Sequence, residues 1–442
     1  MIGCSYGTFF TVTVAGGSYQ EGLVTHIQGV PSGIYIEEEE IYFDLLQRKP
    51  GQGELSSPRR EPDIPVIYTG VNAADTMSGF ANEGYTNGTP LSILIPNLDR
   101  HLEHIEQYRA TNRTPRPGHA SYASYQKYGQ WDDSIGAGIF SGRYTSTIVA
   151  AGALAKKILL DRGIEIFSFV REAAGVTMQD MDYDTISGRV AEFKKIRRDM
   201  DPIYNLVYKQ GRIKTGMRFV EKIAVLAEIE KMIPDIKRSP VSEKEIAELA
   251  EKGLHPVLNC PHLESARAMY DGILAVRDGG DSSGGIVEAV ARGVPAGLGE
   301  PVFNKLDAEL GRMMGIGAVK AVEVGAGTRV KDMQGSQCND QMFMKEGNVA
   351  FSSNNSGGIT GGLSTGQDII VRLAVKPTPT IAKPQKTIDK VSLADAELAA
   401  VTRRDPTIVS RIWPVAEAFM AIVLLDQYII NTAYQEMRKK YS

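Results

Sequence analysis

The chain has 442 residues, of which 43% are hydrophobic and 23% charged, the proportions of a globular protein with a large buried core. Its 49 Lys and Arg residues against 53 Asp and Glu residues give a formal charge of -4, which argues against nucleic-acid binding. Three widely spaced cysteines and an N-terminus without a basic or long apolar run favour a reducing, cytoplasmic location without disulfides or a signal peptide.

Hydrophobic periodicity predicts mixed strands and helices in the first part of the chain. In chain order we expect a strand at 8–15, a strand and turn at 26–33, a helix at 37–48, a helix at 145–160 and a strand at 164–170. The helix at 145–160 is rich in Ala and Gly, which predicts close packing against a neighbour.

Residues 184–253 differ in composition, because they are rich in Lys and Glu and helical in period. Ser242 and Glu245 form a capping box there, so we expect a helical elaboration of a larger domain. Further elements are expected as helices at 265–276, 301–314 and 415–440, and as strands at 286–294, 318–324 and 368–375.

The order of these elements points to the fold class. Strands and helices mix without regular βαβ alternation, which predicts an α+β fold. The apolar stretch at 416–425 is too short and too interrupted by charge to span a bilayer, so we expect no membrane segment.

Motifs of common enzyme classes are absent from the sequence. It has no GxxxxGK[ST] or HExxH pattern, which argues against P-loop and zincin chemistry. His101 and His104 are three residues apart, a pair more typical of a solvated helix face than of a metal site. We therefore expect no metal.

Two stretches carry groups suited to acid–base chemistry. His119 follows Pro117 and Gly118 in a rigid turn, which suits a general acid or base, although a loop histidine bonded to backbone fits equally. Asp405 follows two arginines, which suits either a salt-bridged turn or a carboxylate with a tuned pKa.

Two other stretches carry groups suited to anion binding. Arg48 and Lys49, followed by Arg59 and Arg60, suit carboxylates or phosphates, although a solvated charged loop is the simpler interpretation. The glycine-rich run at 354–362 and the run KPTPT at 376–380 suit a phosphate or the edge of a flavin ring, or else two tight turns.

Read together, these stretches resemble the chorismate synthase family over nearly the whole chain. The matching segments are RPGHA with KYG at 116–129, VAAGALAKKIL at 149–159, ARGVPAGLGEPVFNKLDAEL at 291–310, NNSGGITGG at 354–362, KPTPTI at 376–381, RDP at 404–406 and WPVAEA at 413–418. That many ordered matches make the resemblance specific.

The resemblance implies a fold, a reaction and partners. The fold is a sandwich of antiparallel sheets around central helices, in one domain spanning 1–442 with a helical insertion at 184–253, assembled as a homotetramer. The reaction is a lyase step of the shikimate pathway to aromatic amino acids: anti-1,4-elimination of phosphate from 5-enolpyruvylshikimate 3-phosphate with reduced FMN as cofactor. The expected partners are a small anionic cyclohexene carboxylate and a flavin reductase.

The resemblance also assigns site residues. FMN contacts fall on Ser141, Gly317, Ala318, Gly361, Lys376, Pro377, Thr378, Pro379, Thr380 and Arg403. His119 matches the histidine thought to protonate the reduced flavin, and Ser18 and Asp405 match a relay proposed for the proton at flavin N5.

Several positions depart from the family pattern. Where the family has G-E-S-H-G, this chain has Tyr19 in place of the histidine that serves the leaving phosphate. A family arginine aligns with Glu54, and Ile139, Phe140 and Tyr144 replace an arginine, a serine and a glutamate. Tyrosine carries no charge at pH 7, so the pocket loses positive charge at several points.

The remaining candidate anion anchors are Arg48, Arg60 and Arg143, with Tyr19 at the leaving-group position. We expect a pocket remodelled for a less anionic ligand. Three hypotheses follow: a lyase acting on the usual substrate or a closely related cyclohexene carboxylate, an FMN-binding paralogue acting on a shikimate-like or aromatic acid, and a non-catalytic member.

Overall fold

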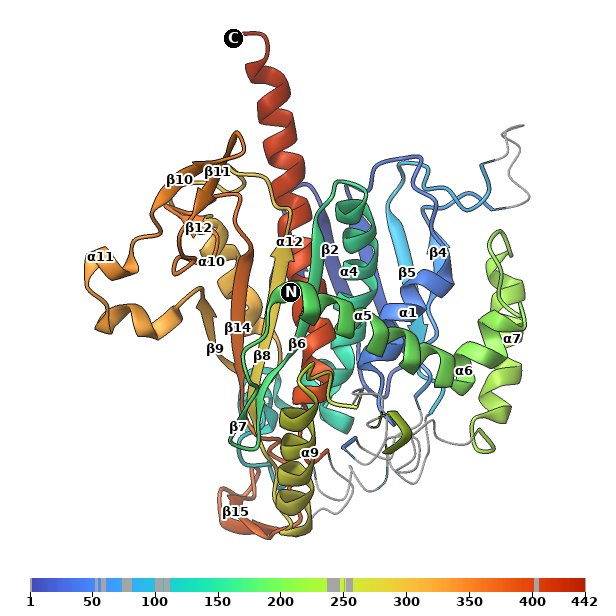
Figure 1. Ribbon diagram of the computed structural model, residues 1–442. Helices are drawn as coiled ribbons and strands as arrows, with labels where there is room; N and C mark the ends of the chain where they lie inside the picture. The colour runs from blue at the N-terminus through green and yellow to red at the C-terminus, as the bar shows by residue number, and fades with distance from the viewer. Residues whose placement is uncertain are drawn as a thin grey trace.

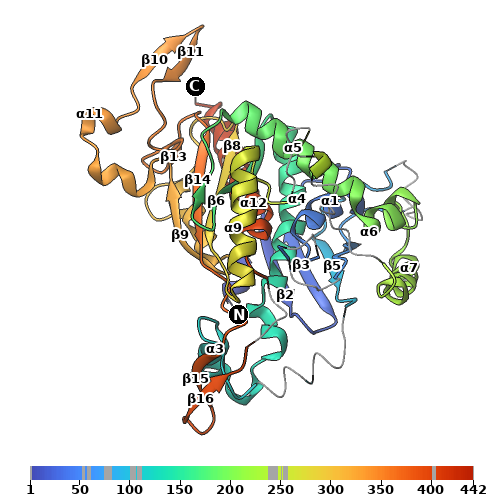
Figure 2. The ribbon, with the colours of Figure 1, turned by 60° about the horizontal axis from the view of Figure 1, so that its bottom comes forward.

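The computed structural model describes residues 2–51, 55–56, 61–73, 82–99, 106, 112–236, 247–249, 251, 257–400 and 405–441. Within them, two five-stranded antiparallel sheets enclose a layer of helices (Figure 1, Figure 2). This arrangement confirms the predicted α+β sandwich.

The first sheet has the strand order β1-β2-β3-β5-β4. Its strands are β1 (Ser5–Tyr6), β2 (Thr11–Gly16), β3 (Gly22–Gln28), β4 (Val66–Thr69) and β5 (Leu91–Pro96). In β5 every second side chain is buried, because one face of the sheet packs on the helices and the other does not.

The second sheet has the order β7-β6-β8-β14-β9. Its strands are β6 (Glu165–Ala173), β7 (Val176–Thr177), β8 (Gly285–Arg292), β9 (Val319–Val324) and β14 (Ile369–Val375). Near-continuous apolar runs in β6, β8 and β14 match their central position, since helices cover both faces of β6 and β8.

The middle layer consists of α1 (Glu38–Arg48), α4 (Thr145–Leu160) and α12 (Val409–Arg438). Helix α4 lies on the first sheet, α12 lies on the second, and the two helices pack on each other. At their contact a Cβ on Gly152 would lie 2.3 Å from the Cβ of Ala418. The predicted close approach of the small-residue helix is therefore confirmed.

Helix α12 is the core helix of the protein. Among the described residues it is the one helix long and apolar enough to cross a membrane, and 83% of its most apolar window is buried inside the molecule. It begins at Val409 rather than at the predicted residue 415, with Pro414 in its second turn. Proline in a second turn removes one helical hydrogen bond, and burial of Val409 and Ile412 holds the turn before it in the helix.

Further helices flank the sandwich. The helices α5 (Tyr183–Met200), α6 (Pro202–Tyr204), π-helix η5 (Asn205–Lys209) and α7 (Phe219–Met232) confirm the predicted helical character within 184–253, and α9 (Leu263–Asp278) covers the outer face of the second sheet. Residues of α6, η5 and α7 build a second, smaller core against α1. That the segment is an insertion relative to the family stays a prediction; Ser242, Glu245, His101 and His104 lie outside the described residues.

Short elements form an arm beyond the second sheet (Figure 1). They are α10 (Leu306–Gly311), η6 (Arg312–Gly315), η7 (Gly327–Asp332), α11 (Gly335–Cys338), β10 (Met342–Lys345), β11 (Asn348–Phe351), β12 (Ile359–Thr360) and β13 (Leu363–Ser364). The helix predicted at 301–314 is wrong over its first turn: Val302 and Phe303 are exposed, so no core contact holds that turn in a helix.

At the opposite end from the arm, η3 (Ile135–Phe140) and η4 (Gly142–Tyr144) lead into α4, and the hairpin of β15 (Gln385–Ile388) and β16 (Asp395–Leu398) lies beside α3 (Ser121–Tyr128). The remaining short turns are η1 (Ile2–Cys4) and η2 (Gly129–Trp131).

Candidate active site

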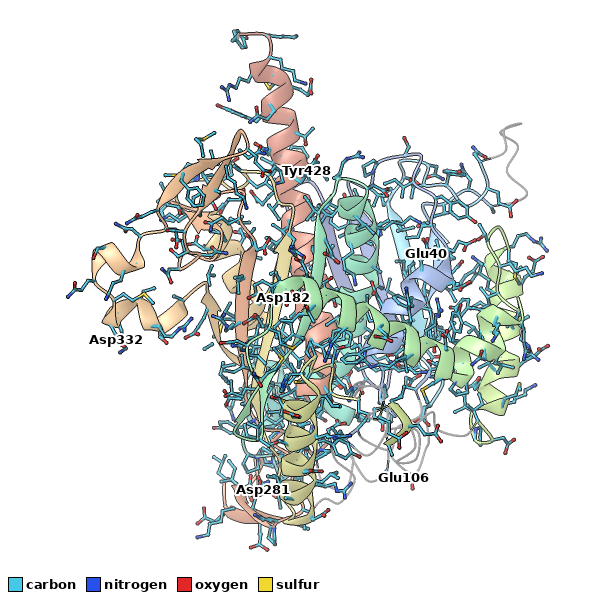
Figure 3. All side chains as sticks on the ribbon, viewed as in Figure 1. Glu40, Glu106, Asp182, Asp281, Asp332 and Tyr428 are labelled. Carbon is cyan, nitrogen blue, oxygen red and sulfur yellow. The ribbon has the colours of Figure 1, made fainter. Side chains whose placement is uncertain are left out.

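Many element ends meet at the lower end of the molecule in Figure 1. The chain leaves α1, β2, β5 and β14 there and enters α4, α12 and β9. Asp281 marks this end in Figure 3, and Asp332 marks the arm. Most of the predicted site residues lie on these connections.

The turn that carries His119 is docked against the run that follows β14. Lys376 Nζ donates to the carbonyl of Gly118, and Arg116 Nη1 lies 3.5 Å from Thr380 Oγ1. Among the described residues, the buried Nδ1 of His119 has no hydrogen-bond partner. Burial, together with Arg116 and Lys376, lowers the pKa of His119 to about 4, so its imidazole is neutral at pH 7.

The run from Lys376 to Thr380 is itself held from several sides. The Lys376 N–H donates to Ala318 O at 2.9 Å, and Ser282 Oγ donates to Thr378 O at 2.7 Å. Thr378 Oγ1 donates to the carbonyl of Asp405 at 2.8 Å. The structure thus brings together four predicted positions that are far apart in the sequence: His119, Ala318, Lys376–Thr380 and Asp405.

Ser18 and Tyr19 lie on the turn after β2, against a left-handed segment of η3. Residues 136–138 all have positive φ, at 58°, 71° and 49°. A Cβ on Gly136 would lie 2.4 Å from the Tyr19 ring and 3.2 Å from Ser18 Oγ. The ring of Tyr19 therefore needs glycine at position 136.

Tyr144 joins η4 to the loop before β9. Its hydroxyl donates to Gly315 O at 2.9 Å and accepts the N–H of Gly317 at 3.0 Å. Burial raises the pKa of Tyr144, so the hydroxyl stays protonated. This contact holds the loop that carries the predicted cofactor positions Gly317 and Ala318. Ser141, another predicted position, caps Arg143 N.

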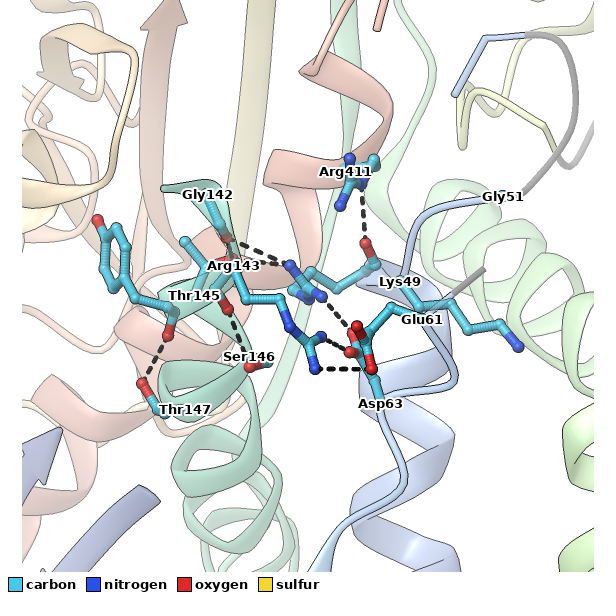
Figure 4. A network of polar contacts seen from close by, with 12 residues as sticks. Lys49, Gly51, Glu61, Asp63, Gly142, Arg143, Thr145, Ser146, Thr147 and Arg411 are labelled. Atoms are coloured by element: carbon cyan, nitrogen blue, oxygen red, sulfur yellow. Dashed lines mark hydrogen bonds and ion pairs between the residues drawn. The ribbon is translucent and has the colours of Figure 1, made fainter. Parts of the chain in front are cut away.

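Arg48 and Arg143 are buried and paired inside the protein. Figure 4 shows Arg143 against Glu61 and Asp63. Both form ion pairs with Asp63, and Arg143 also lies 3.3 Å from Glu61. Two cations face two carboxylates, so this quartet brings no net charge to a ligand. That either arginine binds substrate stays a prediction.

The quartet is tied to neighbouring parts of the site. Arg48 donates to Gly142 O and to Thr145 Oγ1, both at 3.3 Å. Arg411, at the start of α12, donates to the carbonyl of Arg48 at 3.0 Å and pairs with Asp405 at 3.3 Å. The contacts therefore run from the predicted anion anchors to the Asp405 loop.

Three functional candidates escaped sequence reasoning: Glu61, Asp63 and Asn97. Glu61 and Asp63 follow the Arg59-Arg60 pair, and the anion-site hypothesis counted only the cations of that stretch. A buried arginine needs a carboxylate partner, so the acidic residues next to the arginine pair were the signal that could have identified Glu61 and Asp63. Asn97 follows β5 with no motif around it, so its position became visible only in the fold.

Other predicted positions are not gathered here. Gly361 lies in the β12–β13 turn, at the end of β14 that Lys376 does not occupy, and strand length separates the two by about 20 Å. Arg60, Arg403 and Glu54 lie outside the described residues. The Ser18–Asp405 relay stays a prediction.

The residues at this end fit an anionic flavin nucleotide. His119 Nδ1 is buried without a partner among the described residues, Lys376 and Arg116 supply positive charge beside it, and Gly317 is exposed backbone. Among the described residues no group of three or more His, Cys, Asp or Glu side chains could hold a metal ion.

Comparison with known proteins agrees with this arrangement. The family model described as chorismate synthase matches residues 10–429. A chorismate synthase from Acetivibrio thermocellus is 36% identical over 452 residues, covering 98% of this chain and 97% of that protein. One from Methanosarcina barkeri is 38% identical over 430 residues, covering 97% of each.

A solved structure agrees in fold. A crystal structure of chorismate synthase superposes with a TM-score of 0.59 at 26% identity, covering 96% of this chain and 93% of that one. The chain belongs to the chorismate synthase family, a family of carbon–oxygen lyases.

Proposed function

We propose that this protein catalyses the chorismate synthase reaction, the anti-1,4-elimination of phosphate from 5-enolpyruvylshikimate 3-phosphate, with reduced FMN. The observation that carries the proposal is the docking of the His119 turn on the Lys376–Thr380 run, with Nδ1 of His119 buried and lacking a described partner. In a chain of this family, that arrangement supports a flavin-dependent lyase.

The residues take the following roles in this proposal. Ser141, Gly317, Ala318 and the Lys376–Thr380 run hold the cofactor, with a further contact from Arg403. Gly361, which lies at the other end of β14, has no part in this cofactor site. Reduced FMN supplies the electron density that assists loss of the phosphate, with no net redox change. His119 is neutral at pH 7, and in this proposal it exchanges a proton beside the cofactor.

Tyr19 takes the leaving-group position in place of histidine. Its hydroxyl donates one hydrogen bond but brings no positive charge to the phosphate. Ser18 and Asp405 form the proton relay, and Arg48, Arg60 and Arg143 are the proposed anion anchors.

A second candidate is a lyase or other FMN-dependent enzyme acting on a less anionic, shikimate-like or aromatic acid. The specific observation in its favour is that Arg48 and Arg143 are already neutralised by Asp63 and Glu61. A substrate with two carboxylates and a phosphate needs more uncompensated cations than this quartet offers.

An anaerobic assay separates these candidates. Purified protein, chemically reduced FMN and 5-enolpyruvylshikimate 3-phosphate are mixed, and released phosphate and chorismate are quantified together. We expect stoichiometric phosphate and chorismate. Bound FMN with no phosphate release would overturn the proposal in favour of the second candidate, and absence of FMN binding would favour a non-catalytic member.

We propose further that the protein works as a cytoplasmic homotetramer supplied with reduced flavin by a reductase. The arm supports self-association, because Met342, Phe343, Met344 and Val349 of the β10–β11 hairpin are all largely exposed. A two-stranded hairpin is marginally stable in water by itself, and covering its apolar side chains stabilises it.

A further inference from the structure

The contacts of Asn97 single out a residue to which no role has been assigned. Asn97 follows β5 and is buried, at 5% exposure. Its side-chain carbonyl accepts from Arg143 Nε at 2.8 Å. Its side-chain amide donates to Gly17 O at 3.0 Å and to Gln20 O at 2.7 Å.

These hydrogen bonds hold both ends of the turn that carries Ser18 and Tyr19. Gly17 and Gln20 are the residues immediately before and after Ser18 and Tyr19. The backbone N–H of Asn97 also donates to Glu21 O at 3.0 Å, so one residue binds the turn at three carbonyls. From the other side, the turn is held by Ser18 N, which donates to Gly138 O at 3.3 Å.

Asn97 also joins this turn to the buried quartet. Arg143 can present Nε to Asn97 because its guanidinium is already fixed by Asp63 and Glu61. A fixed guanidinium in turn orients the Asn97 amide, since only the carbonyl oxygen can accept from it. Both amide hydrogens then point at the turn.

We propose that Asn97 is a positioning residue, which transmits the fixed orientation of the Arg143 guanidinium to the Ser18–Tyr19 turn. The quartet of Arg48, Arg143, Asp63 and Glu61 serves in this role as a rigid base for the leaving-group side of the site. The inference rests on the proposed function only for its kinetic consequence, because the geometry of the turn can be measured without substrate.

The test is Asn97→Asp, which keeps the size and the acceptor for Arg143 but loses both donated N–H groups. With 5-enolpyruvylshikimate 3-phosphate and reduced FMN we expect kcat to fall about tenfold to a hundredfold, the range for a misplaced catalytic group, with KM changed less than about threefold. Asn97→Ala, which buries no new charge, gives the same split if the aspartate variant fails to fold.

A second readout does not need turnover. The 18 tyrosines are labelled with 3-fluorotyrosine, and the Tyr19 resonance is assigned through Tyr19→Phe. We expect Asn97→Asp to shift or split the fluorine signal of Tyr19. If the wild type lacks turnover, the proposed function fails but this signal still decides the role of Asn97.

The matched control is Asn259→Asp. Asn259 is also fully buried, accepts from Arg197 Nη2 at 2.9 Å and donates to Ser168 O at 2.8 Å, but it lies between α5 and β6. We expect it to lower Tm without changing the Tyr19 signal or the kinetic constants. An unchanged Tyr19 signal in Asn97→Asp, or equal kinetic losses in both variants, would overturn the inference.

Discussion

The surroundings of His119 determine the protonation state of its imidazole. Its ring is mostly buried between Arg116 and Lys376, and both cations oppose a further positive charge. The imidazole is therefore a neutral group at pH 7. The same group in solution would be partly charged near neutral pH.

The low pKa of His119 predicts a pH dependence of stability. In the unfolded chain the histidine titrates near about 6.5, whereas in the folded protein its pKa is about 4. The unfolded state therefore binds more protons between these values, so the stability present above pH 6.5 is lost as pH falls toward 4. We expect His119→Gln to remove up to about 3 kcal/mol of this dependence.

Urea unfolding of both proteins from pH 7 to pH 4 measures this difference, and an NMR titration of the His119 ring gives its pKa directly. A wild-type minus variant difference that stays constant over this range would contradict the assignment.

Gly136 predicts a steric requirement for Tyr19. A methyl group at 136 would overlap the Tyr19 ring, at 2.4 Å, and would also be strained because φ is 58°. We expect Gly136→Ala to cost about 1 kcal/mol for the backbone and to cost more for the displaced ring. Gly163→Ala is the matched control, since it has φ of 76° and nothing within 4 Å.

Chemical denaturation of the two variants separates strain from overlap. Tyr19→Ala in the Gly136→Ala background should recover the excess cost, because the overlap partner is gone. Equal losses in Gly136→Ala and Gly163→Ala would show that Tyr19 does not occupy this position.

At the scale of elements, the polar residues at the end of α1 form hydrogen bonds and ion pairs inside the protein. Gln47 accepts from Arg197 at 2.9 Å, Arg48 joins the quartet, and Lys49 pairs with Asp201. Arg197 and Asp201 belong to the α5–α6 region. This helical segment therefore clamps the end of α1 from which Arg48 reaches the site.

Asp201 predicts how much this clamp contributes. It is buried, caps α6 through Ile203 N at 2.8 Å, and pairs with buried Lys49. We expect Asp201→Ala to cost about 3–5 kcal/mol, because it leaves Lys49 buried without its counter-charge. Urea unfolding measures the loss.

Two comparisons test the cause of that loss. Lys49→Met combined with Asp201→Asn should be less destabilised than Asp201→Ala, since neither charge is then left uncompensated. Asp332→Ala, which removes an exposed partner of Lys331, should change stability by less than about 1 kcal/mol. If Asp201→Ala lowered the free energy of unfolding by no more than Asp332→Ala does, the Lys49–Asp201 pair would not stabilise the end of α1.

At the scale of the whole molecule, the two ends have different surfaces. The lower end in Figure 1 gathers buried and paired charges, and the arm carries exposed apolar side chains. The paired charges suit a site whose geometry must not change, and the exposed methionines suit a surface that another copy of the chain covers.

The arm predicts an assembly that one substitution weakens. We expect the wild-type protein to elute as a tetramer in size-exclusion chromatography with light scattering, and Met344→Glu to dissociate it at least partly. Met344 is 67% exposed in the single chain, and burying a carboxylate in an apolar contact is unfavourable. Val220→Glu, on α7 at 63% exposure, is the control that should leave the mass unchanged.

Sequence reasoning succeeded where one segment carries its own signal. The helix at 145–160 matches α4 because its small residues and period are local, and the α+β class follows from the order of elements. It misjudged residues 301–305 and the start of α12. Only the fold shows that Val302 and Phe303 find no core contact and that Val409 and Ile412 are buried ahead of Pro414.

The sequence by itself determined the family of this protein and the identity of the chemical groups it carries, including Tyr19 in place of a histidine. Only the tertiary structure decided which of these groups meet: His119 with Lys376, and Arg48 and Arg143 with Asp63 and Glu61. The physical reason is that a charge acts through its nearest partners. In a folded chain those partners come from distant segments, so the sequence lists the charges without showing which of them are already neutralised.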